Sequence, residues 1–146
     1  MGTFDFDIPE DIFPKSLTDN LEETCMEAIE EAEKIVVEEM RKQIEAAVSD
    51  KSTGELVKSI KAGKPKQSKF DGFYGKVGPT GYSKSYYYGG QNKKRKYKLS
   101  NAAKLVFIEY GTSKQAARPV LMKIKNNTEK AVINKIQEVI NRKVDR

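Results

Sequence analysis

Residues 107–121, FIEYGTSKQAARPVL, are the most sharply punctuated stretch of this 146-residue chain. Gly111 follows an apolar segment at residues 102–110 and is suited to the left-handed conformation that closes a helix. Pro119 follows a short polar loop at residues 112–117 and suits the first turn of a helix, where its missing N–H group costs little. The stretch therefore predicts a well-defined loop that joins two apolar segments, the second of which is a helix.

The apolar segment before the loop fits two kinds of structure. Ser100 and Asn101 match a helix cap, which favours a helix over residues 102–110. A strand is the alternative, because residues 105–108, LVFI, are also a good β run and short apolar runs are ambiguous. We expect a helix here, and the strand stays open beside it.

Two long amphipathic helices are predicted, because apolar residues recur at three- and four-residue spacing near both ends of the chain. The first is expected from about Ser16 or Thr18 to Val48, since Ser16-x-x-Asp19 approximates a capping box. It would span about 31 residues and 46 Å, against about 38 Å for a compact domain of this size, so it either breaks or projects to meet a neighbour. Its predicted stripe is Leu21, Cys25, Ala28, Ile29, Ala32, Val36, Met40 and Ile44; that of the last helix is Val120, Leu121, Ile124, Ala131, Val132, Ile136, Val139 and Ile140.

Between these helices the residue pattern of the chain changes. Residues 52–55, STGE, match a second capping box and predict a short helix over residues 55–60. From Gly63 onward, glycines and prolines separate short aromatic or β-branched runs, which is typical of a small antiparallel sheet. Residues 1–17 hold two prolines and scattered apolar residues and are expected to form an irregular arm. The predicted fold class is α+β, a single domain at residues 18–146 with a long N-terminal helix and a C-terminal helix packed on the sheet.

A basic run follows three consecutive tyrosines at residues 86–88. The segment fits a hairpin or a flexible loop, and we expect a loop that is mobile when the subunit is alone. Cations beside aromatic rings suit phosphate contact with base stacking, so nucleic-acid binding is one interpretation. The other is a loop that is solvated or orders against an acidic partner surface. The candidate cations are Lys93, Lys94, Arg95, Lys96 and Lys98.

The composition removes much catalytic chemistry. The chain has no histidine and a single cysteine, Cys25. Without imidazole there is no Ser-His or Cys-His nucleophile pair and no imidazole metal ligand, and one thiol cannot form an internal disulfide. The glutamates of the first helix are interpreted as a solvent-exposed face rather than a metal site, because charges opposite an apolar stripe are normally solvated. We expect no enzymatic activity, no cofactor, no metal and no membrane span.

The charge is strongly asymmetric along the chain. Residues 1–50 carry 15 acidic and 4 basic side chains, whereas residues 51–146 carry 6 acidic and 23 basic ones. The basic part of such a subunit suits a polyanion, or copies of the subunit could meet with acidic surface against basic. The sequence favours neither of the two.

Residues 107–121 closely resemble the signature of the small phage tail-component family named after gene product ten of the Hong Kong 97 phage. Members show a Glu-aromatic-Gly-Thr element, a short loop, and Ala-Arg-Pro before the last helix. A second family feature, Thr-Gly-x-Leu followed by a basic residue and Ser-Ile, appears as residues 53–60, TGELVKSI, and the resemblance covers about residues 18–144. Val120, where the family commonly has an aromatic, and the enlarged basic segment depart from the pattern. The matching signature residues are Glu109, Tyr110, Gly111, Thr112, Arg118 and Pro119.

The resemblance implies a structural subunit of a phage or prophage particle, placed at the neck or the tail end and acting through ring assembly. Its implied partners are copies of itself and adjacent connector or tail proteins. DNA contact through the basic segment is a further candidate, which rests on the residues of that segment and not on the resemblance. The implied location is the virion, and the bacterial host cytoplasm during assembly. The alternative function is that of a small basic nucleic-acid-binding protein.

The signature residues are also candidates for an assembly loop. Gly111 permits a positive φ, and Pro119 fixes the entry of the last helix. Glu109 and Arg118 are expected to pair across the loop and to hold its shape. We expect the rigid loop formed in this way to be presented to a neighbouring subunit.

Overall fold

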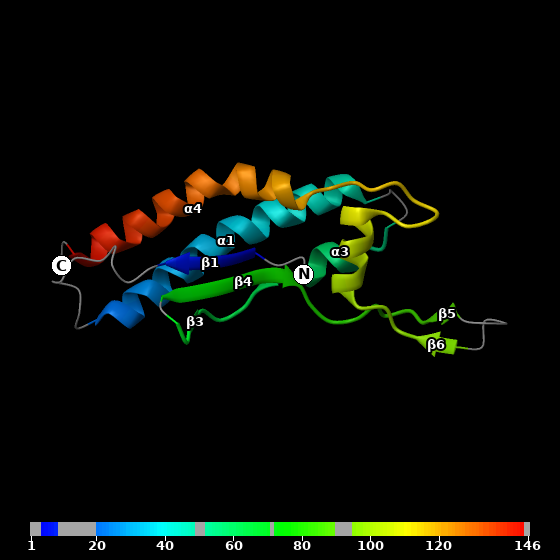
Figure 1. Cartoon of the computed structure of the whole chain (residues 1–146), viewed down its shortest axis with the longest axis horizontal. Coiled ribbons are helices and arrows are strands. Elements are labelled where there is room, and N and C mark those ends of the chain that lie inside the picture. Colours follow the sequence, from blue (N-terminus) through cyan, green and yellow to red (C-terminus); the bar gives the residue numbers. More distant parts are fainter. Residues whose placement is uncertain (1–3, 9–19, 49–51, 71, 90–94, 145–146) are drawn as a thin grey trace.

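Two long helices run side by side along the molecule, and a small antiparallel sheet lies against one of them (Figure 1). The computed structural model describes residues 4–8, 20–48, 52–70, 72–89 and 95–144. Helix α1 (Leu21–Ala47) contacts both α4 (Leu121–Val144) and strand β4 (Phe73–Pro79), so it lies between the second long helix and the sheet. The other elements are β1 (Phe4–Ile8), α2 (Glu55–Ser59), β2 (Ile60–Ala62), β3 (Lys66–Gln67), β5 (Tyr87–Gly89), β6 (Arg95–Tyr97) and α3 (Asn101–Tyr110).

The predicted α+β class is confirmed, and α1 has no break. It is continuous over 27 residues, which corresponds to about 40 Å. The predicted start at Ser16 or Thr18 lies outside the described residues. At the other end Val48 leaves the helix in an extended conformation while its N–H still donates to the Ile44 carbonyl. The molecule accommodates the unbroken helix by being elongated, with α4 alongside it (Figure 1).

The predicted apolar stripes of the two helices are largely confirmed. On α1, every predicted member from Cys25 to Ile44 is fully buried, and Leu21 is half-buried. On α4 the prediction is wrong for Ala131, which is exposed because it lies one position off the buried line through Ile124 and Val132. The stripe is continued by Thr128, which is buried with its hydroxyl donating to the Ile124 carbonyl at 2.7 Å.

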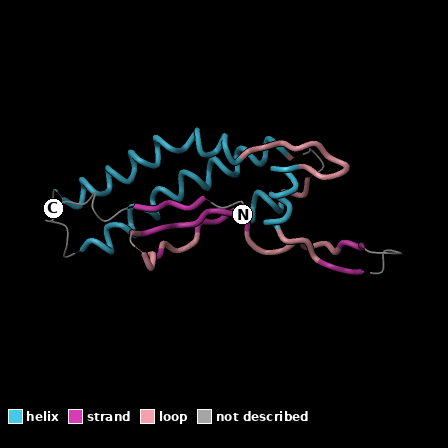
Figure 2. Tube along the Cα trace, viewed as in Figure 1, coloured by secondary structure: helices cyan, strands magenta, loops and turns pink. Residues whose placement is uncertain are grey.

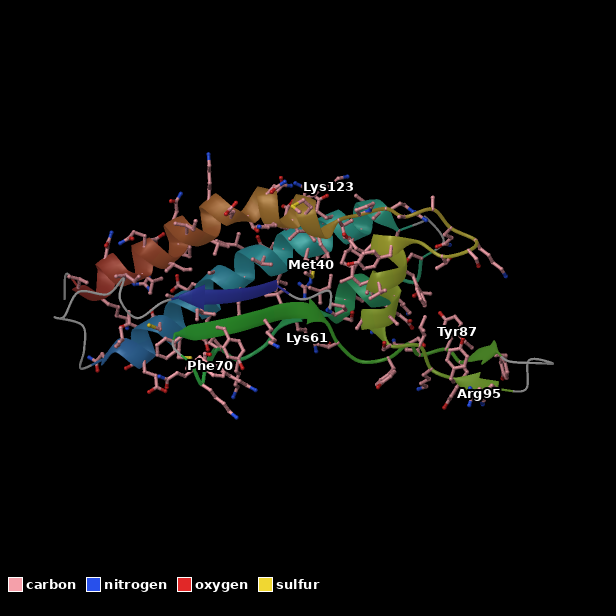
Figure 3. The ribbon with its side chains drawn as sticks, viewed as in Figure 1. Met40, Lys61, Phe70, Tyr87, Arg95 and Lys123 are labelled. Carbon is pink, nitrogen blue, oxygen red and sulfur yellow. The ribbon has the colours of Figure 1, made fainter. Side chains whose placement is uncertain are left out.

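Strand β4 is the centre of the sheet. β1 pairs with one edge of β4, and β2 and β3 pair in turn with the other edge, all antiparallel. Phe73 and Val77 are buried on the face toward α1, and Met40 of α1 lies in the interior above that face (Figure 3). The predicted short helix is confirmed as α2, except that Ile60 already belongs to β2.

The expected irregular arm at residues 1–17 is wrong for residues 4–8. These residues form β1, in which Phe4 lies opposite Val77 and Ile8 opposite Phe73. The sequence FDFDI alternates apolar and acidic residues with a period of two, which is the pattern of a strand with one buried face. Residues 9–17 lie outside the described part of the chain.

A glutamate of α1 is buried beneath the sheet. Glu33 is 1% exposed, which corrects the expectation that all the glutamates of this helix form a solvent-exposed face. Its carboxylate lies against Gly75 of β4, where a side chain would collide with it. Desolvation by burial raises the pKa of Glu33 to about 7, and the charge of the neighbouring Glu30 acts in the same direction. Its Oε1 has no hydrogen-bond partner among the described residues.

Gly75→Ala should destabilise the protein, because the new Cβ would lie 2.0 Å from Glu33 Oε1 and 2.6 Å from Ile29 Cγ2. Overpacking of this kind lowers the free energy of unfolding by about 1–3 kcal/mol. Gly63→Ala is the matched control, since its Cβ would meet the Lys76 carbonyl at 3.5 Å, an ordinary contact. Urea unfolding of both variants checks the prediction, and equal losses in the two would contradict the close packing at Gly75.

Glu33→Gln should remove a pH-dependent loss of stability. The pKa of Glu33 is raised from 4.5 to about 7 in the folded protein, so the folded state keeps a proton that the unfolded state has released. Stability therefore falls as pH rises from about 4.5 to about 7, and the variant should exceed the natural protein by at most about 3 kcal/mol above pH 7. Denaturant unfolding across this range measures the difference. The exposed Glu38→Gln is the control, and parallel curves for all three proteins would refute the prediction.

Candidate functional site

The signature residues lie at one end of the molecule, where the end of α3, the start of α4 and the end of α1 come together (Figure 1). We call residues 108–121 the α3–α4 corner. The segment before it is a helix, so the strand alternative for residues 102–110 is wrong. Ser100 caps this helix as predicted, because its hydroxyl oxygen accepts a hydrogen bond from the Ala103 N–H.

The side chain of Glu109 binds the N-terminus of α4. Its Oε2 accepts hydrogen bonds from the N–H groups of Val120 at 2.8 Å and Leu121 at 3.2 Å. These are among the N–H groups that a helix start leaves without an internal partner, and a carboxylate there also interacts favourably with the helix dipole. Glu109 therefore caps a helix that begins twelve residues further along the chain.

The side chain of Arg118 binds the C-terminus of α1. Its Nη1 donates to the Ala47 carbonyl at 2.5 Å, and its backbone N–H donates to the Ile108 carbonyl at 2.7 Å. The expected ion pair between Glu109 and Arg118 is therefore not what the corner contains, since no ion pair joins them among the described residues. Instead, each of the two side chains bonds to backbone groups that the end of a helix leaves unpaired.

The loop at residues 112–117 is exposed but internally bonded. The Thr112 N–H donates to the Gln115 carbonyl at 2.9 Å, and the Thr112 hydroxyl accepts from the N–H groups of Lys114 and Gln115. Gly111 has the predicted positive φ, 77°, but its ψ of 178° is not that of the predicted left-handed helical conformation. A Cβ there would lie 2.7 Å from the Ala117 nitrogen. Beside the loop, the ring of Tyr110 is 69% exposed. The corner thus presents a fixed shape to solvent.

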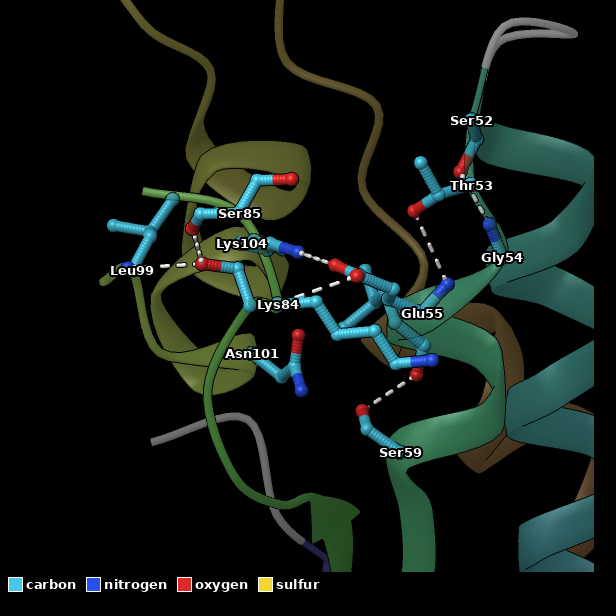
Figure 4. Close-up of polar contacts among 12 residues, drawn as sticks. Ser52, Thr53, Gly54, Glu55, Ser59, Lys84, Ser85, Leu99, Asn101 and Lys104 are labelled. Carbon is cyan, nitrogen blue, oxygen red and sulfur yellow. Dashed lines mark hydrogen bonds and ion pairs between the residues drawn. The ribbon is translucent and has the colours of Figure 1, made fainter. Parts of the chain in front are cut away.

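The second motif, residues 53–60, forms α2 and the start of β2, but not through the predicted capping box. The residue at the helix start is Gly54, with a φ of 73° and no side-chain cap. Glu55 instead accepts from the backbone N–H of Lys84 at 3.3 Å and pairs with Lys104 of α3 at 3.0 Å (Figure 4). The hydrogen bond from Lys104 holds the pKa of Glu55 below its usual value. Sequence reasoning missed this bridge, because 49 residues separate its partners.

The basic segment forms a hairpin, which corrects the expectation of a loop. Strands β5 and β6 pair with Tyr87 opposite Tyr97 and Gly89 opposite Arg95, and the two tyrosine rings stack at 6.3 Å. Lys96 and Lys98 place their ammonium groups 4.1 Å and 5.1 Å from the centre of the Tyr86 ring. These contacts supply the cross-strand attraction that makes a short hairpin form. Lys93 and Lys94 lie outside the described residues.

The hairpin projects from the body beyond α3 (Figure 2). Its base is fixed: the Ser83 N–H donates to the Leu99 carbonyl at 2.8 Å, and the Asn101 side chain donates to the Thr80 carbonyl at 2.8 Å. The tips of Tyr87 and Arg95 lie on the projecting part (Figure 3). The hairpin and the α3–α4 corner therefore lie at opposite ends of α3, and the structure does not bring the two groups of candidate residues into one site.

A pocket of about 500 Å³ opens at the base of the hairpin. Three lysines, Lys58, Lys61 and Lys84, line it together with Glu55 and Tyr82. Within the described ranges, no group of His, Cys, Asp or Glu side chains is arranged to hold a metal ion. Nor is any described helix long and apolar enough to cross a membrane.

Comparison with known proteins identifies one family. The model of the HK97-gp10-like family, described as "Bacteriophage HK97-gp10, putative tail-component", matches residues 13–111, which is more than half of the chain. The match includes α1, α2, α3, strands β2 to β6 and the Glu109–Gly111 part of the corner. It leaves out β1, and it ends before Thr112, Arg118 and Pro119. No curated protein and no solved structure matches the chain.

Glu109→Ala should destabilise the fold, because it removes the cap of α4. We expect the free energy of unfolding to fall by about 0.5–2 kcal/mol, and Arg118→Ala to lower it by about 0.5–1.5 kcal/mol through loss of the bond to Ala47. Lys114→Ala, in the same exposed loop, is the control and should stay within about 0.5 kcal/mol. Chemical denaturation measures all three. A loss in Glu109→Ala no larger than in the control would show that the carboxylate does not cap α4.

Proposed function

Because the chain belongs to the HK97-gp10-like family of bacteriophage tail components, we propose that it is a structural subunit of the neck or tail end of a phage or prophage particle. It completes or joins this part of the particle by assembling into a ring with copies of itself. Its other partners are the adjacent connector or tail proteins. It works in the virion, after assembly in the cytoplasm of the bacterial host.

The α3–α4 corner is the observation that carries this proposal. Its loop is exposed, yet its shape is set by its own backbone hydrogen bonds and by Glu109 and Arg118, which bind it to two helix ends. A surface that is ordered before contact loses less conformational freedom on binding. Such a loop suits a subunit that must fit a fixed neighbour, with Tyr110 as an exposed aromatic beside it.

A second hollow adds shape to the same surface. A pocket of about 250 Å³ lies where the end of α1 meets the start of α4, lined by Ala47, Arg118, Pro119 and Lys123 among others. Lys123 points outward from this end of α4 (Figure 3). The corner thus offers an exposed loop next to a recess, and a neighbouring subunit could be complementary to this shape.

The alternative function is nucleic-acid binding through the hairpin. The observation that favours it is the exposure of Tyr86, Tyr88 and Tyr97 beside Arg95 and Lys96. Bases can stack on exposed aromatic rings, and cations can contact phosphates. This function predicts affinity of the isolated chain for DNA or RNA that falls steeply with salt.

Light scattering over a range of protein concentration and salt should show association into rings or smaller oligomers that weakens as salt is added. A short duplex DNA in a parallel series should not bind. Arg118→Ala should weaken the association relative to Lys114→Ala, because the loop loses its attachment to α1. Tight, salt-dependent DNA binding by a persistent monomer would favour the alternative function. An Arg118→Ala protein that folds and associates normally would exclude the loop as an assembly surface.

A further inference from the structure

We propose that the β5–β6 hairpin of one copy docks on the exposed acidic side chains of the first turns of α1 in the next copy. This proposal rests on the proposed ring assembly, and it specifies which two surfaces meet between neighbouring copies. One surface is the described part of the hairpin, residues 86–89 and 95–98. The other, which we call the acidic turns, is the outward face of residues 22–30.

The hairpin is firmly attached but poorly covered. At its base, Ser83 and Leu99 are bonded through backbone and side chain, and the Lys84 N–H donates to Glu55. Beyond the base, the rings of Tyr86 and Tyr88 are 51% and 61% exposed, and Arg95 and Lys96 are exposed too. A two-stranded hairpin is only marginally stable by itself in water, and large exposed aromatic groups mark interaction surfaces. An arm that is fixed at its base and exposed along its strands suits docking against a neighbour.

The acidic turns are the matching surface on the same chain. Glu22, Glu23 and Glu30 are exposed, and within the described residues no ion pair or hydrogen bond occupies their carboxylates. Two other glutamates of α1 are already paired within the chain. Arg142 binds Glu27 at 2.7 Å and Glu31 at 2.9 Å.

The two surfaces can meet only between molecules. The hairpin and the start of α1 lie at opposite ends of the elongated molecule (Figure 1). Contact between them is therefore head-to-tail, with a different surface used on each copy. Contacts of this kind produce a closed ring when the rotation between copies allows closure, and a filament when it does not. The geometry of the contact thus agrees with the ring proposed from the family.

The contacts within the hairpin favour a protein partner over a nucleic acid. The rings of Tyr87 and Tyr97 stack on each other, and the ring of Tyr86 already faces two ammonium groups. A ring face used in this way is not free to receive a base, whereas the guanidinium of Arg95 can still meet carboxylates. Binding of DNA by the hairpin is an outcome that the test must detect.

Two charge-reversed double variants of the full chain test the contact. Arg95→Glu with Lys96→Glu reverses the hairpin, and Glu23→Lys with Glu30→Lys reverses the acidic turns. Lys125→Glu with Lys130→Glu changes two exposed lysines of α4 and matches the first variant in charge. Self-association is measured by sedimentation at low salt, circular dichroism checks folding, and fluorescence anisotropy tests binding to a labelled short duplex DNA.

Each reversed variant alone should associate about tenfold more weakly or worse, because like charges then face each other, while the α4 variant should change by less than about twofold. An equimolar mixture of the two reversed variants should recover association, since in alternating order both of its interfaces pair opposite charges. Recovery requires the two surfaces to touch, and a merely unfolded variant would not show it.

The remaining outcomes each overturn the contact and separate it from the proposed function. If the natural chain associates and the reversed variants associate equally well, the hairpin contact is wrong and ring assembly stands on other surfaces. If the natural chain stays monomeric even at about 1 mM and low salt and binds no DNA, contact between copies is wrong, and the structural role would depend on other proteins. If it stays monomeric and binds DNA through Arg95 and Lys96, both proposals fail.

Discussion

The packing of α1 against α4 on one side and β4 on the other is the contact on which the rest of the structure depends. One cluster of buried side chains joins these elements: Val36 and Met40 of α1 belong to it together with Val77 of β4, Leu105 of α3 and Ile124 of α4. Most of the stability of a helix in a protein comes from the packing of its apolar face, so burial of the apolar stripe of α1 stabilises this helix over its 27 residues. Because α3 is anchored in the same cluster, both the corner and the hairpin at its two ends take their places from this packing.

The α3–α4 corner shows how the requirements of folding and of surface shape fall on the same side chains. The start of α4 needs acceptors for its N–H groups, and the end of α1 needs donors for its carbonyls. Glu109 and Arg118 meet these needs from within one short segment. The chain between them is consequently fixed while it stays exposed, which is unusual for a loop and valuable for one that faces a partner.

The charge asymmetry of the chain is partly resolved inside the molecule. Arg142 and Lys143 at the end of α4 bind Glu27 and Glu31 of α1, so the acidic first third and the basic remainder already meet once within each subunit. Among the charges that stay exposed are Glu22, Glu23 and Glu30 in the first turns of α1 and Arg95 and Lys96 in the hairpin. These two segments lie at opposite ends of the molecule (Figure 1). An elongated molecule with opposite charges at its ends has a direction, and this direction favours head-to-tail contacts.

The sequence by itself determined the local features: the two long helices, the helix of α3, the loop after Gly111, the α+β class and the family. Each rests on periodicity or on a residue with a fixed backbone preference, which neighbours in the chain are enough to define. Only the tertiary structure decided where side chains find partners. It paired FDFDI with β4, folded the tyrosine and lysine run into a hairpin, buried Glu33 against Gly75, and sent Glu109 and Arg118 to different helix ends. These outcomes depend on contacts between residues far apart in the chain, and local spacing carries no information about such contacts.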